Sequence, residues 1–139
     1  MDMTTITEDY VSFEIAKLLK KKGFNEECFA LYNPDGVLIQ SGIRLNNIQV
    51  GRVEGSYSAP TLQMVMKWLR EVHYLHITVH PGVSEYGFVW TYAIVFAKEA
   101  GKGETHFYKI SQITTPIVKS KSYEQACEAA IQYCLKHLI

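Results

Sequence analysis

The chain has 139 residues, of which 47% are hydrophobic and 20% are charged, and its 14 basic and 14 acidic side chains give a formal net charge of zero. This length and composition are typical of one globular domain, and they exclude a disordered chain and a disulfide-rich mini-protein. A balanced charge does not favour electrostatic binding to nucleic acid.

The N-terminal residues, the longest apolar run and the cysteines together indicate the cellular compartment of the protein. The first ten residues, MDMTTITEDY, contain acids and lack the basic and apolar segments of a secretory signal. The longest apolar run, residues 88–97, is too short to cross a bilayer as a helix. The three cysteines, Cys28, Cys127 and Cys134, have no framework spacing. We therefore expect a cytoplasmic protein with reduced thiols and no membrane anchor.

A first helix is expected from Glu8 to Lys22, with Thr7 as its N-cap and with Gly23 and Phe24 forming a Schellman ending. The basic cluster of this region consists of Lys17, Lys20, Lys21 and Lys22. We interpret this cluster as a solvated helix end whose charge suits the helix dipole, rather than as a nucleic-acid patch.

A hairpin is expected next, because the turn sequence Asn33-Pro34-Asp35-Gly36 separates two strand-like segments. The segment from Gly42 to Gly55 is irregular, and a short strand is expected there. That strand would include Ile48, Val50, Arg52 and Val53.

Two further helices follow from apolar periodicity. One should begin near Pro60 and bury Leu62, Val65, Met66, Leu69 and Val72. The other should begin at a capping box, residues 122–125, near the end of the chain. Its inner stripe would consist of Ala126, Cys127, Ala130, Ile131, Cys134 and Leu138.

Strands are expected over residues 75–80, 86–97 and 105–110, with a turn at 98–104 and an extended segment at 113–118. The predicted order is α-β-β-(β)-α-β-β-β-α. This order indicates a single α+β domain over residues 1–139, with a mostly antiparallel sheet and three helices.

The segment HYLHITVH, from His73 to His80, raises the question of a metal site. On a strand, His76 and His80 would lie about 13 Å apart, because each residue adds roughly 3.3 Å. A metal ion needs ligand nitrogens about 2 Å away from it. The spacing therefore predicts no metal site, and no cofactor motif occurs elsewhere.

The strands over 75–80 and 86–97 leave two possible registers. A loop over residues 81–85 would place His76 opposite Trp90, so that both histidines lie among aromatic side chains. A one-residue slip would instead place Leu75, Ile77 and Val79 with the aromatics. We favour the second register, because it covers the bulky aromatics with helices.

No catalytic residues are predicted. Cys127 and Cys134 lie two turns apart on an inner helix face, where buried structural thiols are typical. Cys134 and His137 could touch, but no third group supports them as a nucleophile and base. The acids form no pair, and no phosphate-binding loop or nucleophile elbow occurs.

Three segments together resemble a family of small proteins common in gut-bacterial chromosomes, prophages and mobile elements. They are YVSFEIAKLLKKKGFNEECFALY, YSAPTLQMVMKWLREVHYLHITV and SYEQACEAAIQYCLKHLI. The most specific parts are Ala59-Pro60-Thr61 and Trp68-Leu69-Arg70-Glu71. The resemblance implies a phage-related setting, and it carries no assigned activity and no catalytic residues.

We expect an interaction module that binds another protein or forms a homodimer, rather than an enzyme. Its interaction or ligand surface is predicted to include His76, His80, Trp90 and Tyr92. The alternative is a small enzyme or ligand-binding domain whose pocket lies near His76 and Trp90. Nucleic-acid and membrane partners are not favoured.

Overall fold

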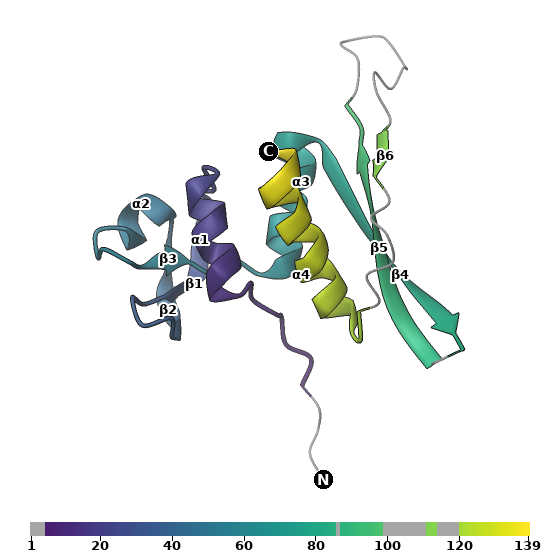
Figure 1. The fold of residues 1–139 in the computed structure, drawn as a ribbon. Coiled ribbons are helices and arrows are strands. Elements are labelled where there is room, and N and C mark those ends of the chain that lie inside the picture. Colours follow the sequence, from purple (N-terminus) through teal and green to yellow (C-terminus); the bar gives the residue numbers. More distant parts are fainter. Residues whose placement is uncertain (1–4, 86, 99–110, 114–119) are drawn as a thin grey trace. The chain divides into compact units, whose positions relative to one another are not determined.

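The computed structural model describes residues 5–85, 87–98, 111–113 and 120–139. Its chain divides into two compact units, Met1–Leu62 and Gln63–Ile139, and each unit is described by itself. Both units combine helices with a three-stranded antiparallel sheet, so the predicted α+β class is confirmed. Figure 1 shows the elements along the chain.

The first unit contains α1 (Phe13–Lys21), β1 (Cys28–Tyr32), β2 (Leu38–Leu45), α2 (Asn47–Val50) and β3 (Tyr57–Ser58). The strand order is β2-β1-β3. The α1 helix packs on one face of this sheet, where the ring of Phe13 lies 5.4 Å from that of Tyr32 and 5.8 Å from that of Tyr57.

The start of α1 differs from the predicted one. Ser12 is the N-cap and accepts a hydrogen bond from the Ile15 amide, so the helix begins five residues after Glu8. Residues 9–11 are extended instead, because Tyr10 pairs with Thr61 and the Val11 amide donates to the Pro60 carbonyl. Tertiary pairing has overridden local helix propensity at this point.

The end of α1 follows the prediction. The Phe24 amide donates to the Leu19 carbonyl over 2.9 Å, and Gly23 has a φ of 92°, as a Schellman ending requires. The predicted hairpin is also present between β1 and β2, with Gly36 at a φ of 79°.

The prediction of a short strand within residues 42–55 was wrong. Residues Asn47–Val50 form a single helical turn, α2, with a capping box between Asn46 and Gln49. This box satisfies the first amides of the turn and explains why apolar Ile48 and Val50 do not continue a strand. The two-residue strand β3 follows and was not predicted.

The second unit contains α3 (Leu62–His73), β4 (Leu75–Ser84), β5 (Gly87–Phe96), β6 (Ser111–Ile113) and α4 (Tyr123–Tyr133), which ends in a π-helical turn, η1 (Cys134–Leu138). The strand order is β4-β5-β6. The predicted strand over 105–110, most of the turn at 98–104 and most of the extended segment at 113–118 lie outside the described residues.

The last helix packs against β4 and β5. Ser122 caps it as predicted, accepting a hydrogen bond from the Gln125 amide over 3.1 Å. The expected inner stripe is buried except for Leu138, which is half-buried, while Leu135 is fully buried instead. The π-helical turn explains this exchange, because its wider turn shifts the positions that face inward.

Candidate functional site

The β4–β5 hairpin settles the choice between the two registers. Leu75 pairs with Phe96, Ile77 with Ile94 and Val79 with Tyr92. Paired residues point to the same side of an antiparallel sheet. The aliphatic residues of β4 therefore share a face with the aromatics of β5, so the favoured facing is confirmed. The ladder itself is displaced further than one residue, because His80 pairs with Thr91 and not with a residue next to Tyr86.

One face of this hairpin, which we name the covered face, carries the core of the second unit. Leu75, Ile77, Tyr92 and Ile94 are buried on it. The α4 helix packs against both strands, and its buried residues include Ile131 and Leu135. The strand alternation predicted from the sequence thus corresponds to a true inside face.

The opposite face, the histidine face, carries His76, Thr78 and His80 on β4. The His76 ring Nε2 donates to the Ala97 carbonyl over 3.3 Å. The His80 ring Nε2 lies 3.1 Å from the Thr78 hydroxyl. Both histidines thus bond to neighbouring groups of the same hairpin, and the described residues contain no cluster of three or more side chains able to hold a metal ion.

The four predicted surface residues are therefore divided between two faces. His76 and His80 lie on the histidine face, while Trp90 and Tyr92 lie on the covered face. A pocket lined by both His76 and Trp90 would have to pass through the sheet. The described geometry gives that ligand-binding alternative no support.

Trp90 lies at the border of the covered face. Its ring is 5.6 Å from that of Tyr123 at the start of α4, and 5.3 Å from that of Phe88. Its backbone pairs with Ser120 through two hydrogen bonds of 3.0 Å. Tyr92, one pair nearer to the core, is only 8% exposed and so cannot present much surface to a partner.

Beyond Trp90, toward the turn of the hairpin, the residues of this face are exposed. Val83 is 85% exposed and Phe88 is 62% exposed, and these two residues face each other across the hairpin. Figure 1 shows that the turn end of the hairpin extends away from α4. We name this apolar area the hairpin tip surface; it consists of Pro81, Val83, Phe88 and Trp90.

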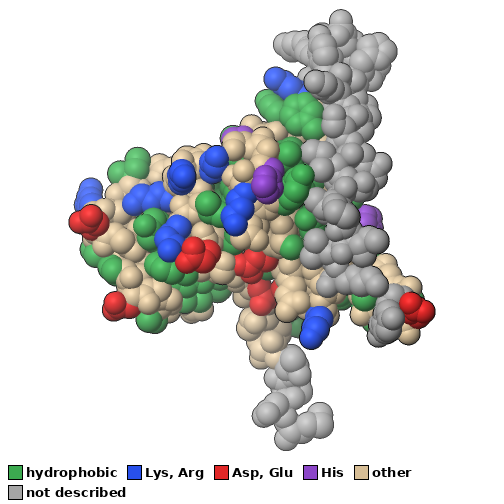
Figure 2. All heavy atoms as spheres, in the orientation of Figure 1, with side chains coloured by type: hydrophobic (Ala, Val, Ile, Leu, Met, Phe, Trp, Pro, Cys, Tyr) green, Lys and Arg blue, Asp and Glu red, His purple; other side chains and the backbone are tan. Residues whose placement is uncertain are grey.

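A second exposed apolar area lies on the first unit, along β2. Leu38, Ile39 and Ile43 are 39%, 42% and 64% exposed, and Phe29 on β1 is 51% exposed. Figure 2 shows hydrophobic side chains on the surface of this unit among charged ones. Sequence reasoning missed this area, although the uncharged run from Val37 to Ile43 was a signal for it.

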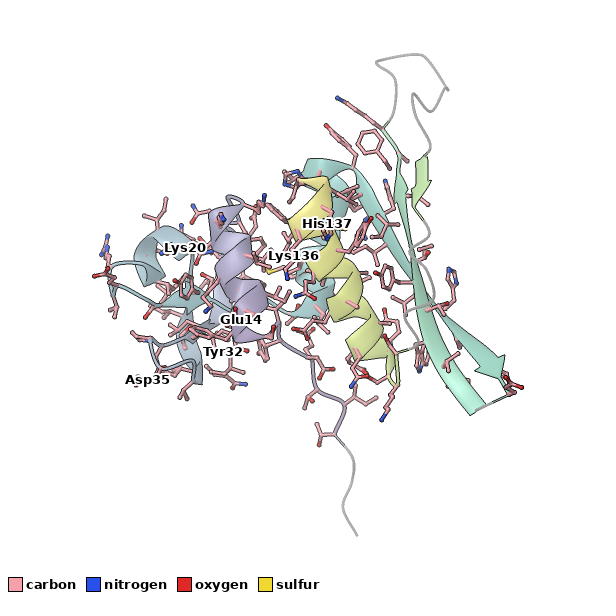
Figure 3. All side chains as sticks on the ribbon, in the orientation of Figure 1. Glu14, Lys20, Tyr32, Asp35, Lys136 and His137 are labelled. Atoms are coloured by element: carbon pink, nitrogen blue, oxygen red, sulfur yellow. The ribbon has the colours of Figure 1, made fainter. Side chains whose placement is uncertain are left out.

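A shallow pocket of about 390 Å³ is also present in the first unit, and Figure 3 labels Lys20, which lies beside it on α1. Its lining consists of Lys20, Gly23, Phe24, Asn25, Asn47, Ile48 and Gly51. Both polar atoms of the Asn47 side chain already have a partner within the first unit, because the amide nitrogen donates to the Phe24 carbonyl and the oxygen accepts from the Ser58 amide. This pocket therefore offers no convergent polar groups beyond Lys20 and Asn25.

The cysteines and His137 do not form a reactive pair. All three cysteines are buried and unbridged, and burial raises the pKa of the Cys28 and Cys134 thiols to about 12. The ring of His137 lies 4.8 Å from that of Tyr133 in a tilted arrangement; Figure 3 labels His137 near the end of the last helix. A thiol with a raised pKa is a poor nucleophile.

His73, at the end of α3, has a perturbed environment. Its Nε2 atom is buried without a hydrogen-bond partner among the described residues, and its ring lies 4.7 Å from that of Trp68. Burial lowers the pKa of His73 below its ordinary value. The neutral imidazole is thus favoured in the folded protein.

The first prediction concerns this histidine. The folded state binds a proton at His73 less well than the unfolded state does. The stability of the fold that depends on neutral His73 is therefore complete above about pH 6.5 and is lost as the pH falls below that value. Urea unfolding at about pH 8 and about pH 5.5 should show this loss. The His73→Phe variant should lose less stability between the two pH values than the wild type, whereas the control Val72→Ala, at an exposed position of the same helix, should keep the pH dependence of the wild type. An unchanged pH dependence in His73→Phe would contradict the assignment.

Comparison with protein-family models, with curated proteins and with solved structures found no match for this chain. The resemblance to small mobile-element proteins therefore stays a prediction. No helix among the described residues is long and apolar enough to span a membrane.

Proposed function

We propose that this chain is a small protein-interaction module that binds another protein or a second copy of itself. The observation that carries the proposal is the hairpin tip surface. Its residues continue the core face of the sheet past the end of its helix cover, which leaves Val83 and Phe88 in solvent. Aromatic and apolar side chains grouped in this way are characteristic of protein contact sites.

The chemistry of the remaining candidates supports a binding role. The histidines bond within their own hairpin, and the thiols are buried with raised pKa values. Three unbridged, buried thiols also support our proposal of a reducing cytoplasmic setting. The resemblance of the Tyr57–Val79 segment supports a phage or mobile-element origin.

Photo-crosslinking tests the proposal directly. A photo-reactive phenylalanine derivative at position 88 should give a covalent adduct with a protein in the cells that carry the gene. The adduct mass distinguishes a second copy from a different protein. The same derivative at position 71, where the Glu71 side chain is 62% exposed on α3, is the matched control. Equal, background-level labelling at both positions would rule out the hairpin tip surface as a contact site.

A further inference from the structure

The outer edge of β2 has backbone groups that no described strand pairs with, since the sheet order is β2-β1-β3. The Asn33 amide donates to the Val37 carbonyl over 3.0 Å, which makes residues 33 and 37 a hydrogen-bonded pair. Hydrogen-bonded and non-bonded pairs alternate in an antiparallel ladder. The pairs Tyr32–Leu38 and Ala30–Gln40 are therefore non-bonded, and the amides and carbonyls of Leu38 and Gln40 point outward.

Between Leu38 and Gln40, where β2 pairs regularly with β1, this edge lacks the charges, proline and bulge that normally prevent strand addition. Natural edge strands are short, or they carry charges or a proline. From Leu38 to Ile43, β2 has neither a charge nor a proline, and the irregular part of its pairing with β1 begins only after Gln40. The edge of β4 differs, because Pro81 interrupts it. Pro81 pairs with Trp90, whose backbone bonds to Ser120 on the other side, so position 81 faces outward and presents no amide hydrogen.

Charges at the two ends of β2 indicate which strand would fit. Asp35 lies in the turn before β2, at the position labelled in Figure 3, and Arg44 lies near the end of β2. Both side chains are exposed, and the Arg44 guanidinium stacks on the Phe29 ring at 5.0 Å. In an antiparallel pair of two β2 strands centred on Ile39 or Gln40, the turn that holds Asp35 of one copy lies toward the end of β2 that holds Arg44 of the other. The twofold axis repeats this arrangement at the opposite end.

We propose that two copies of the chain pair antiparallel through β2, forming a continuous six-stranded sheet from their first units. The outward amides of Leu38 and Gln40 supply the central hydrogen bonds. The exposed side chains of Leu38 and Ile39 each gain a lateral neighbour from the other copy on their own face of the sheet, and the opposite charges of Asp35 and Arg44 at the two ends favour the antiparallel direction. This inference deepens the proposed function, on whose self-association branch it rests, by naming a second copy as the partner of this edge.

The test uses the full-length chain and measures the dimer dissociation constant by sedimentation. Gln40→Pro removes an outward amide hydrogen without removing a bond to β1, so dimerisation should weaken on the order of thirty-fold. Val79→Pro makes the matching change at an outward-facing position of the β4 edge, outside the hairpin tip surface, and should leave the dissociation constant unchanged. Thermal unfolding of each variant confirms that it remains folded.

A charge exchange provides a test that does not depend on proline. Arg44→Glu should weaken the dimer by about three-fold to five-fold, and Asp35→Lys combined with Arg44→Glu should restore it. A dimer that is unaffected by Gln40→Pro and by the charge variants would overturn the β2 pairing while self-association stands. A chain that is monomeric at all concentrations would overturn the β2 pairing, and binding of a different protein would still be decided by the position-88 crosslink.

Discussion

Replacing Ile94 by alanine is expected to lower the free energy of unfolding by about 3 kcal/mol. Ile94 is fully buried on the central strand β5, where it pairs with Ile77 on one side and with Ile113 on the other. Its loss leaves a cavity under α4 in addition to the lost transfer free energy. Chemical denaturation followed by circular dichroism measures the change.

The control for this experiment is Val83→Ala on the same hairpin. Val83 is 85% exposed, so its truncation should change the free energy of unfolding by less than about 0.5 kcal/mol. If Ile94→Ala were as mild as Val83→Ala, then the covered face would not be a closed core. The hairpin tip surface would then not differ from the rest of that face.

Replacing Asn47 by alanine is expected to cost about 3 kcal/mol. This side chain is 4% exposed and joins two parts of the first unit. Its amide nitrogen donates to the Phe24 carbonyl over 2.7 Å, and its oxygen accepts from the Ser58 amide over 2.9 Å. Alanine would remove the buried hydrogen-bond partner that Asn47 supplies to each of these two backbone groups, which costs more than the net value of the hydrogen bonds themselves.

Asn25→Ala is the matched control for this second change. Asn25 is an exposed asparagine whose oxygen accepts one hydrogen bond from the Ile48 amide over 3.1 Å. Its loss should cost about 1 kcal/mol, because water can replace the bond. Equal losses for the two variants, measured by the same denaturation, would show that burial of the Asn47 amide does not determine its contribution.

The sequence was most informative where large and small or apolar and polar side chains alternate with the two-residue period of a strand. Alternation in residues 75–80 and 86–97 predicted both strands of the hairpin, and the need to cover the aromatics favoured the side-chain facing that is present, although not the exact register. The length of the turn could not be predicted. A positive φ at Gly87 supports a tight turn, so β4 continues to Ser84 through the segment expected to be a loop.

Local signals failed where distant residues decide the structure. Thr7 and Glu8 are good helix-start residues, yet pairing with Thr61 and Pro60 keeps residues 9–11 extended. The Asn46–Gln49 capping box was visible in the sequence, but the apolar residues around it were interpreted as a strand. For the candidate site, the sequence located the hairpin and Trp90. The exposure of Phe88 could not be predicted, because it depends on how far along the hairpin α4 packs.

The buried cysteines allow opening of the two units to be timed separately. Cys28 belongs to the first unit, and Cys127 and Cys134 belong to the second. Because burial keeps these thiols protonated and shielded, a thiol-reactive reagent can modify each one only when its surroundings open. Mass spectrometry of a native-state labelling time course would then assign a separate opening rate to each unit, from reporters already present in the natural chain.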